Sequence, residues 1–159
     1  MTTPDRIKSV KVLTNGYYAF YDLHRPVYHA YAAAHLPPEE AQIAVGMTFA
    51  VVVENWTSVV TERHPARWAW SHHTRTVARR CGHTPTAIEV TRLLHDDLHM
   101  TIDQIATVTG TDRAAVLAHL VAADRAVAPH RRRPRPRARP SVSPEERWRN
   151  AFRLRTATA

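Results

Sequence analysis

The segment from residue 63 to 80 has the residue types best suited to bind a nucleic acid. It carries five arginines and no acidic residue, with Trp68 and Trp70 between them. Guanidinium groups meet phosphates while aromatic rings stack on bases, so this combination is typical of single-strand binding. We expect Trp68 to anchor the core. The candidate DNA contacts are Trp70, Arg75, Arg79 and Arg80, and a helix would present residues 75 and 79 on one face.

A second candidate for DNA binding is a helix-turn-helix pattern over residues 101–127. Thr101 with Gln104 forms a capping box at the start of a short helix, and Gly110 ends that helix. Thr111 is then predicted to cap a longer helix. The residues expected to face inward are Ile105, Ala106 and Val108 in the first helix, and Val116, Leu117, Leu120 and Val121 in the second.

The exposed residues of this pattern are the ones that could touch DNA, because a helix-turn-helix places its second helix in the major groove. These candidates are Thr111, Arg113, His119 and Arg125. The alternative is a tri-helical interaction fold that no longer binds DNA.

The positive charge of the chain lies in its C-terminal segment. The net charge is +8, and residues 131–159 alone carry ten arginines and two glutamates. Residues 129–140 hold six arginines and four prolines, which predicts a disordered, basic tail, followed by a short basic helix after Ser143. The tail adds the DNA-contact candidates Arg131, Arg132 and Arg133. The alternative function for it is simply to keep the protein soluble.

The residues that could support metal binding or catalysis are sparse. His95 and His99 have zinc-compatible spacing, but no general-base glutamate adjoins them, and Cys81 with His83 is a weak second pair. The chain has 4 glycines and contains neither a phosphate-binding glycine loop nor a nucleophile elbow. We therefore expect a protein that is not an enzyme and that needs no metal and no cofactor.

The cellular location follows from what the sequence lacks. The longest apolar stretch, Ile43 to Val53, has 11 residues, whereas a membrane-spanning helix needs about 20. The N-terminus has no apolar signal core, and the chain has a single cysteine. We expect a cytoplasmic protein that has no contact with membranes.

The apolar periodicity predicts an all-α fold. A helix is expected from Tyr17, after a turn at Asn15-Gly16, with a kink or break at Pro26. A second helix, residues 38–56, should be buried on nearly all sides along Ile43–Val53, although a strand is the alternative over Phe49–Val53. Further helices are expected over residues 65–80 and 85–98, the latter with Ile88, Leu93, Leu94 and Leu98 facing the core.

This order of helices resembles the small two-domain sigma factors of bacterial RNA polymerase, the extracytoplasmic-function group. The segments FYDLHRPVYHAYAAAHL, PPEEAQIAVGMTF and HPARWAWSHHTRTVARR are similar to the family's second region. The segment MTIDQIATVTGTDRAAVLAHLVAADRAV is similar to its fourth region, a helix-turn-helix. The resemblance implies a sigma-region-2-like domain at 1–82, a helix-turn-helix domain at 83–128 and an Arg/Pro-rich tail at 129–159.

The resemblance also implies a function and partners. The protein would be a sigma-factor-like, DNA-binding transcription regulator, with DNA, RNA polymerase core and an anti-sigma or other protein as partners. The family's acidic and amide residues before Thr-Phe, which bind the polymerase clamp, correspond to Ile43, Gly46 and Met47 here. We therefore predict weak binding to polymerase. The alternative function is a protein-interaction module on a sigma-like scaffold that has lost promoter recognition.

Overall fold

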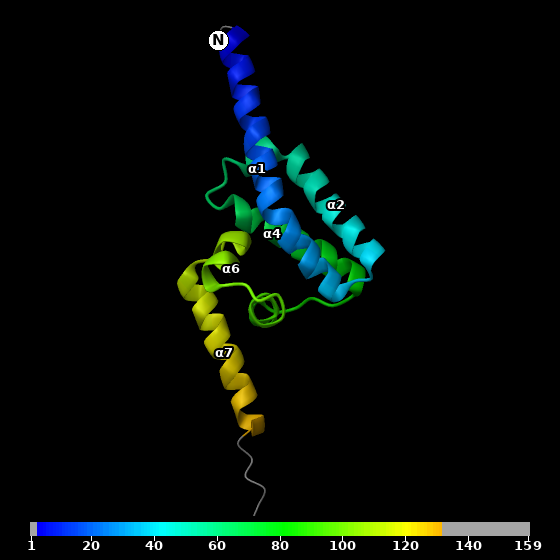
Figure 1. Ribbon diagram of the computed structural model, residues 1–159, viewed down its shortest axis with the longest axis vertical. Helices are drawn as coiled ribbons and strands as arrows, with labels where there is room; N and C mark the ends of the chain where they lie inside the picture. The colour runs from blue at the N-terminus through cyan, green and yellow to red at the C-terminus, as the bar shows by residue number, and fades with distance from the viewer. Residues whose placement is uncertain (1–2, 132–159) are drawn as a thin grey trace, which may run out of the picture. The chain divides into compact units, whose positions relative to one another are not determined.

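The computed structural model describes residues 3–131, and this part of the chain is all-α, as the periodicity predicted (Figure 1). It contains seven α-helices, one π-helical turn and no strand between residues 3 and 131. In chain order the elements are α1 (Thr3–His35), α2 (Pro38–Glu54), α3 (Trp56–Val59), α4 (Pro65–Cys81), α5 (Ala87–Arg92), the π-helical turn η1 (Leu93–Asp97), α6 (Ile102–Thr109) and α7 (Arg113–Arg131).

Helix α1 is longer than predicted and has no break. The turn expected at Asn15-Gly16 lies inside it, and so does Pro26. At residue 16 a Cβ would lie 3.5 Å from the Trp56 side chain, and the Trp56 indole N–H donates to the Leu13 carbonyl at 2.7 Å. This packing against α3 outweighs the local preference of Asn-Gly for a turn. Pro26 is exposed, so solvent can satisfy the carbonyl that its missing N–H leaves free.

The core between α1, α2 and α4 is built around aromatic rings. Tyr28 stacks on Phe49 at 5.4 Å between ring centroids, and its edge meets Trp70 at 5.2 Å. Tyr31 meets the same indole at 5.0 Å. Trp70 is therefore a core residue, only 7% exposed, while Trp68 is partly exposed. Trp68, which was expected to anchor the core, packs against it but is only partly buried.

Helix α2 confirms the helical interpretation of Phe49–Val53, but it is buried on one side only. The buried side consists of Ala41, Ala44, Val45, Thr48, Phe49 and Val52. On the other side Ile43 is 46% exposed, Met47 49% and Val53 48%. The expectation of burial on nearly all sides was wrong, because α1 and α4 cover only one face of α2. We call Ile43, Met47 and Val53 the outer α2 face.

The segment after α4 begins with a capping box that was not predicted from the sequence. The Thr86 side chain accepts the Glu89 backbone N–H at 3.3 Å, and the Glu89 carboxylate accepts the Thr86 N–H at 2.7 Å. This capping box starts α5, which passes into η1 instead of continuing as an α-helix to residue 98. Leu94 is fully buried as predicted, whereas Ile88 is 38% exposed and so does not face the core.

The helix pair α6 and α7 follows in the predicted order. The Thr101–Gln104 capping box is present, Ile105 and Val108 are buried, and Gly110 ends α6 with a left-handed φ of +64°. Helix α7 starts at Arg113, so Asp112, not Thr111, directly precedes it.

The inward stripe predicted for α7 is only partly correct. Val116 is buried, but Leu117 is 42% exposed and Val121 46%, because no other described helix covers that side.

One hydrophobic core joins the early and late helices. Leu94, Ile105, Val108 and Val116 belong to the same cluster of buried residues as Tyr28 and Trp70. Residues 1–126 accordingly form one compact unit. The boundary predicted between residues 82 and 83 does not separate two cores, and the predicted tail at 129–159 lies almost entirely outside the described residues.

Candidate nucleic-acid interface

Helix α4 separates an apolar face from a cationic one. His64 precedes its first residue, Pro65, and Gly82 ends it with a left-handed φ of +72°. The buried face holds Ala69, Trp70, His73, Thr76, Val77 and Ala78. The opposite face exposes Arg67, Arg75 and Arg79. The rotation of this helix therefore decides which way its arginines point.

His73 fixes the rotation of α4 about its own axis. Its ring stacks on Tyr28 at 4.5 Å with an interplanar angle of 17°. Nε2 lies 2.9 Å from the Tyr28 carbonyl, which can only accept, so Nε2 carries a proton. Nδ1 lies 2.9 Å from the Thr48 hydroxyl. Burial lowers the pKa of His73 to about 4, so the ring is neutral near pH 7. These bonds attach α4 to both α1 and α2.

A groove of about 580 Å³ runs along the cationic face of α4 and is closed on its other side by α5 and the start of α7. We call it the α4–α7 groove. Its lining residues are Trp70, Ser71, Thr74, Arg75, Ala78, Arg79, Gly82, Thr84, Pro85, Ala87, Val90, Thr91, Thr109, Thr111, Val116 and His119. None of these described residues is acidic.

A smaller hollow of about 350 Å³ adjoins the groove at the N-terminal end of α4. Its lining residues are Glu62, Arg63, His64, Arg67, Trp68, Ser71, His72 and Arg75, so it shares Ser71 and Arg75 with the groove. The Trp68 and His72 rings stack at 6.0 Å with an interplanar angle of 10°. Burial, with Arg75 and Arg79 nearby, lowers the pKa of His72.

Three arginines of the described part are paired with a carboxylate: Arg80 with Glu40 at 2.7 Å, Arg92 with Asp96 at 3.1 Å, and Arg113 with Asp103. Within residues 9–127, no carboxylate lies within ion-pairing distance of Arg63, Arg67, Arg75 or Arg79. We call these four the α4 arginines, with Arg63 lying two residues before the helix begins. They present a positive charge that is not compensated locally.

The predicted contact residues are distributed over several places. Arg75, Arg79, Thr111 and His119 all line the α4–α7 groove, so the structure brings these four together. Trp70 lines the same groove from the core side, with little exposed surface.

The remaining predicted contacts lie elsewhere. Arg80 is held by Glu40 and Arg113 by Asp103, and Arg125 is exposed on α7 without lining the groove. Arg131 is the last residue of α7, and Arg132 and Arg133 lie outside the described residues.

Four further residues belong to this surface although they were not predicted as contacts: Arg63, Arg67, Trp68 and His72. A signal for Trp68 and His72 was present in the sequence. Trp68, His72, Arg75 and Arg79 recur at steps of four, three and four residues, which is the spacing of one helical face.

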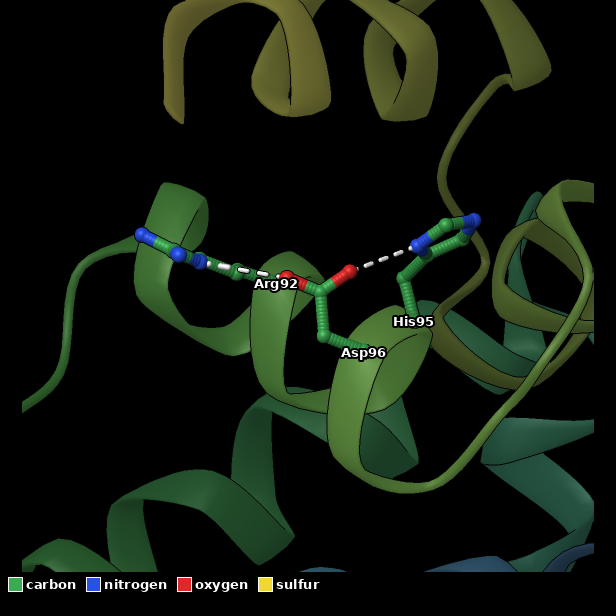
Figure 2. Close-up of polar contacts among 3 residues, drawn as sticks. All are labelled: Arg92, His95 and Asp96. Carbon is green, nitrogen blue, oxygen red and sulfur yellow. Dashed lines mark hydrogen bonds and ion pairs between the residues drawn. The ribbon is translucent and has the colours of Figure 1, made fainter. Parts of the chain in front are cut away.

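His95, one of the two histidines with zinc-compatible spacing, is hydrogen-bonded to a neighbouring carboxylate (Figure 2). Nδ1 of His95 lies 2.9 Å from one carboxylate oxygen of Asp96, and Arg92 donates to the other at 3.1 Å. The His95 hydrogen bond is the main cause that lowers the pKa of Asp96. His99 has a left-handed φ of +52° at the start of the connection to α6. Among the described residues, no three His, Cys, Asp or Glu side chains are grouped so that they could hold a metal ion.

No protein-family model, no curated protein and no solved structure matches the chain. Within residues 3–131, every helix is too short or too polar to cross a bilayer.

Proposed function

We propose that the protein is a sigma-factor-like, non-catalytic transcription regulator of the cytoplasm that binds DNA through the exposed face of α4. The observation that carries the proposal is the charge of that face. Four arginines without a carboxylate partner lie on this helix or just before it, and three of them, Arg63, Arg67 and Arg75, line one hollow with the partly exposed ring of Trp68. Within residues 9–127 the other arginines without a carboxylate partner, Arg25 and Arg125, lie singly on α1 and α7.

The mechanism uses two contributions to affinity. The α4 arginines replace counter-ions on the phosphates, which provides affinity that is independent of base sequence. Trp68, stacked on His72, offers a ring to an unpaired base, and such stacking contributes about 1–3 kcal/mol per base. The combination favours a single-stranded or locally opened strand along α4. The second contact in this proposal is RNA polymerase core, bound weakly through α2.

The test compares unpaired arginines of α4 with a paired arginine on another helix. In fluorescence anisotropy with a labelled single strand, Arg75→Gln/Arg79→Gln should reduce affinity at least tenfold. The slope of the logarithm of the binding constant against the logarithm of salt concentration should become shallower by about 1.4, because each lost phosphate contact removes roughly 0.7. The matched control is Arg92→Gln, which removes an arginine that is paired with Asp96. Equal losses in both proteins would contradict the proposal.

A second candidate function is favoured by the outer α2 face. Ile43, Met47 and Val53 are each about half exposed on the helix that would face polymerase. An apolar surface of this kind suits a protein partner better than a nucleic acid. In this alternative the scaffold is a protein-interaction module, and its partner is an anti-sigma protein or another protein.

One pair of variants distinguishes the two functions. Met47→Lys changes the outer α2 face without touching the core, and Arg75→Gln/Arg79→Gln changes α4 alone. Quantitative co-purification of a protein partner other than polymerase core from the native cells should respond to Met47→Lys only if the module function holds. Strand binding should respond only to the arginine pair if the DNA function holds.

A further inference from the structure

We propose that the α4–α7 groove is a nucleotide-binding site that takes one base against its apolar wall and the adjoining phosphate between Arg75, Arg79 and His119. The proposal deepens the DNA-binding function proposed above, because it assigns one nucleotide of the ligand to a defined place. It concerns the groove and not the smaller hollow beside Trp68, with which the groove shares Ser71 and Arg75.

The size and the wall of the groove fit a base. The volume of about 580 Å³ lies in the range of roughly 300–1,000 Å³ that small-molecule sites occupy. Trp70, Ala78, Val90 and Val116 supply apolar surface from three different helices. Because Trp70 is fixed by Tyr28 and Tyr31, this wall is formed before any ligand arrives.

The charges at the groove fit a phosphate. Arg75 and Arg79 are one helical turn apart, and the Arg79 Nε–H donates to the Arg75 carbonyl at 3.3 Å. That bond leaves the terminal nitrogens of Arg79 available for a ligand. The only other titratable side chain of the described lining is His119, and no carboxylate is there to repel an anion. An anion with an apolar body is therefore the complementary ligand.

His119 adds a third polar group beside the two arginines. Its Nδ1 lies 3.1 Å from the hydroxyl oxygen of Thr91, which also lies 2.7 Å from the Ala87 carbonyl. Nδ1 is therefore engaged with the protein, and Nε2 is the ring nitrogen that a phosphate would meet.

The rim of the groove adds hydroxyl groups. Thr84 lies on the connection between α4 and α5, and Thr111 lies between α6 and α7. The hydroxyl of Thr109, in contrast, is bonded to the Ile105 carbonyl at 2.7 Å. The rim hydroxyls suit the sugar that links a base to its phosphate.

The test is calorimetric titration of the full chain with three probes. These are a deoxyadenosine dinucleotide, a 5′-mononucleotide and inorganic phosphate. The dinucleotide carries one phosphodiester and therefore resembles a segment of a strand. We expect the dinucleotide to bind. Tighter binding of the mononucleotide would identify a free nucleotide as the ligand, and tighter binding of the dinucleotide would identify a strand.

Three variants assign the binding to the groove. His119→Gln removes a ring that lines the phosphate end of the groove, so it should weaken binding of the dinucleotide several-fold. Ala87→Phe adds a ring at an exposed lining position, so it should weaken the dinucleotide at least fivefold and leave inorganic phosphate unaffected. Arg125→Gln is the matched control, because Arg125 lies on α7 outside the groove lining.

The result that would overturn the inference differs from the one that would overturn the proposed function. If long single strands bind with the expected loss in Arg75→Gln/Arg79→Gln, but Ala87→Phe and His119→Gln have no effect on any probe, the groove is not a nucleotide site although α4 binds DNA. If neither strands nor dinucleotides bind, both proposals fail. Unfolding curves for each variant identify any that lose binding because they do not fold.

Discussion

Gly110 lies directly against the backbone of Arg67. A Cβ at residue 110 would come within 2.8 Å of the Arg67 Cα, which is closer than real Cβ contacts allow. The Arg67 side chain closes the contact from its own side, with Nε donating to the Gly110 carbonyl at 3.0 Å. The turn between α6 and α7 is thereby fixed to the first turns of α4.

Gly110→Ala should destabilise the protein more than Gly82→Ala. Both glycines have a positive φ, +64° and +72°, so both variants incur backbone strain of about 1–2 kcal/mol. At Gly82 a Cβ would meet no atom within 4 Å, whereas at Gly110 it meets the backbone of Arg67. Denaturant unfolding of the two variants is the measurement. Equal losses of free energy of unfolding in the two variants would show that α4 can move away from the added methyl group at residue 110 without a further loss of stability.

Acid should destabilise the fold well above the pKa of its carboxylates. Burial lowers the pKa of both His24 and His73 to about 4, from an ordinary value of 6.5. The unfolded chain therefore binds more protons between pH 6.5 and 4, and stability that is present above pH 6.5 is lost as the pH falls. We expect a loss of about 2 kcal/mol for each histidine between pH 7 and pH 5.

A variant assigns part of that slope to one residue. His24 packs its ring against Phe20 at 4.0 Å, so His24→Phe keeps an aromatic ring and should flatten the pH dependence of unfolding. The exposed His83 provides the control, since His83→Asn should leave the slope as it is. A slope unaffected by His24→Phe would place the acid sensitivity elsewhere.

Arg113 should become available to DNA when its partner is removed. In the structure it is paired with Asp103. Asp103→Asn should raise duplex affinity several-fold, because it frees a cation and removes an anion. The double variant Asp103→Asn/Arg113→Ala separates these two effects. If the gain persists without Arg113, the gain comes from the lost repulsion of Asp103 alone.

The tail should account for most non-specific affinity for duplex DNA. Residues 131–159 carry a net charge equal to that of the whole chain. Replacing the six arginines of residues 129–140 by glutamine in the full-length protein should weaken binding to random duplex and reduce its salt dependence. Binding to a short single strand should change much less, because that contact is assigned to α4. The opposite pattern would locate strand binding in the tail.

Gly46→Ala should stabilise the protein. Residue 46 lies inside α2 and is exposed, and a methyl group at this position would meet no other atom within 4 Å. Alanine is favoured over glycine in a helix interior by about 1 kcal/mol. A melting temperature that fails to rise would indicate that the open side of α2 is already engaged, for example by a second copy of the chain.

The caps and ends of helices could be predicted because they depend on residues close in the sequence. The burial of particular side chains could not, because it depends on packing between helices. Thr101, Gln104 and Gly110 act through neighbours only a few residues away, so their roles were readable. The choice between Trp68 and Trp70 depends on which face of α4 meets Tyr28 and Tyr31, residues some forty positions earlier. Neighbouring positions along a helix differ by about 100°, and the one local indication of that rotation was the spacing that puts Trp68 on the same face as Arg75 and Arg79.

The extent of helix–helix coverage was the other unpredictable quantity. Ile43, Met47, Leu117 and Val121 have the side chains of core residues but lie where no described helix covers them. For the candidate site, the spacing of Arg75 and Arg79 could be read directly from the sequence. Their meeting with Thr111 and His119 across a groove depends on how α7 approaches α4, which only the folded chain reveals.

Trp70 of α4, Ile105 of α6 and Val116 of α7 are buried in one core, so α4 and the first turns of α7 are packed together and not joined by a free linker. A regulator with two DNA-binding units on a flexible linker can follow changes in the distance between two DNA sites, but it loses the freedom of the linker on binding. Under the proposed function, two helices packed in one core would lose no such freedom and would accept one spacing. Any tolerance for other spacings would then come from bending or twisting of the nucleic acid, whose stiffness depends on its sequence.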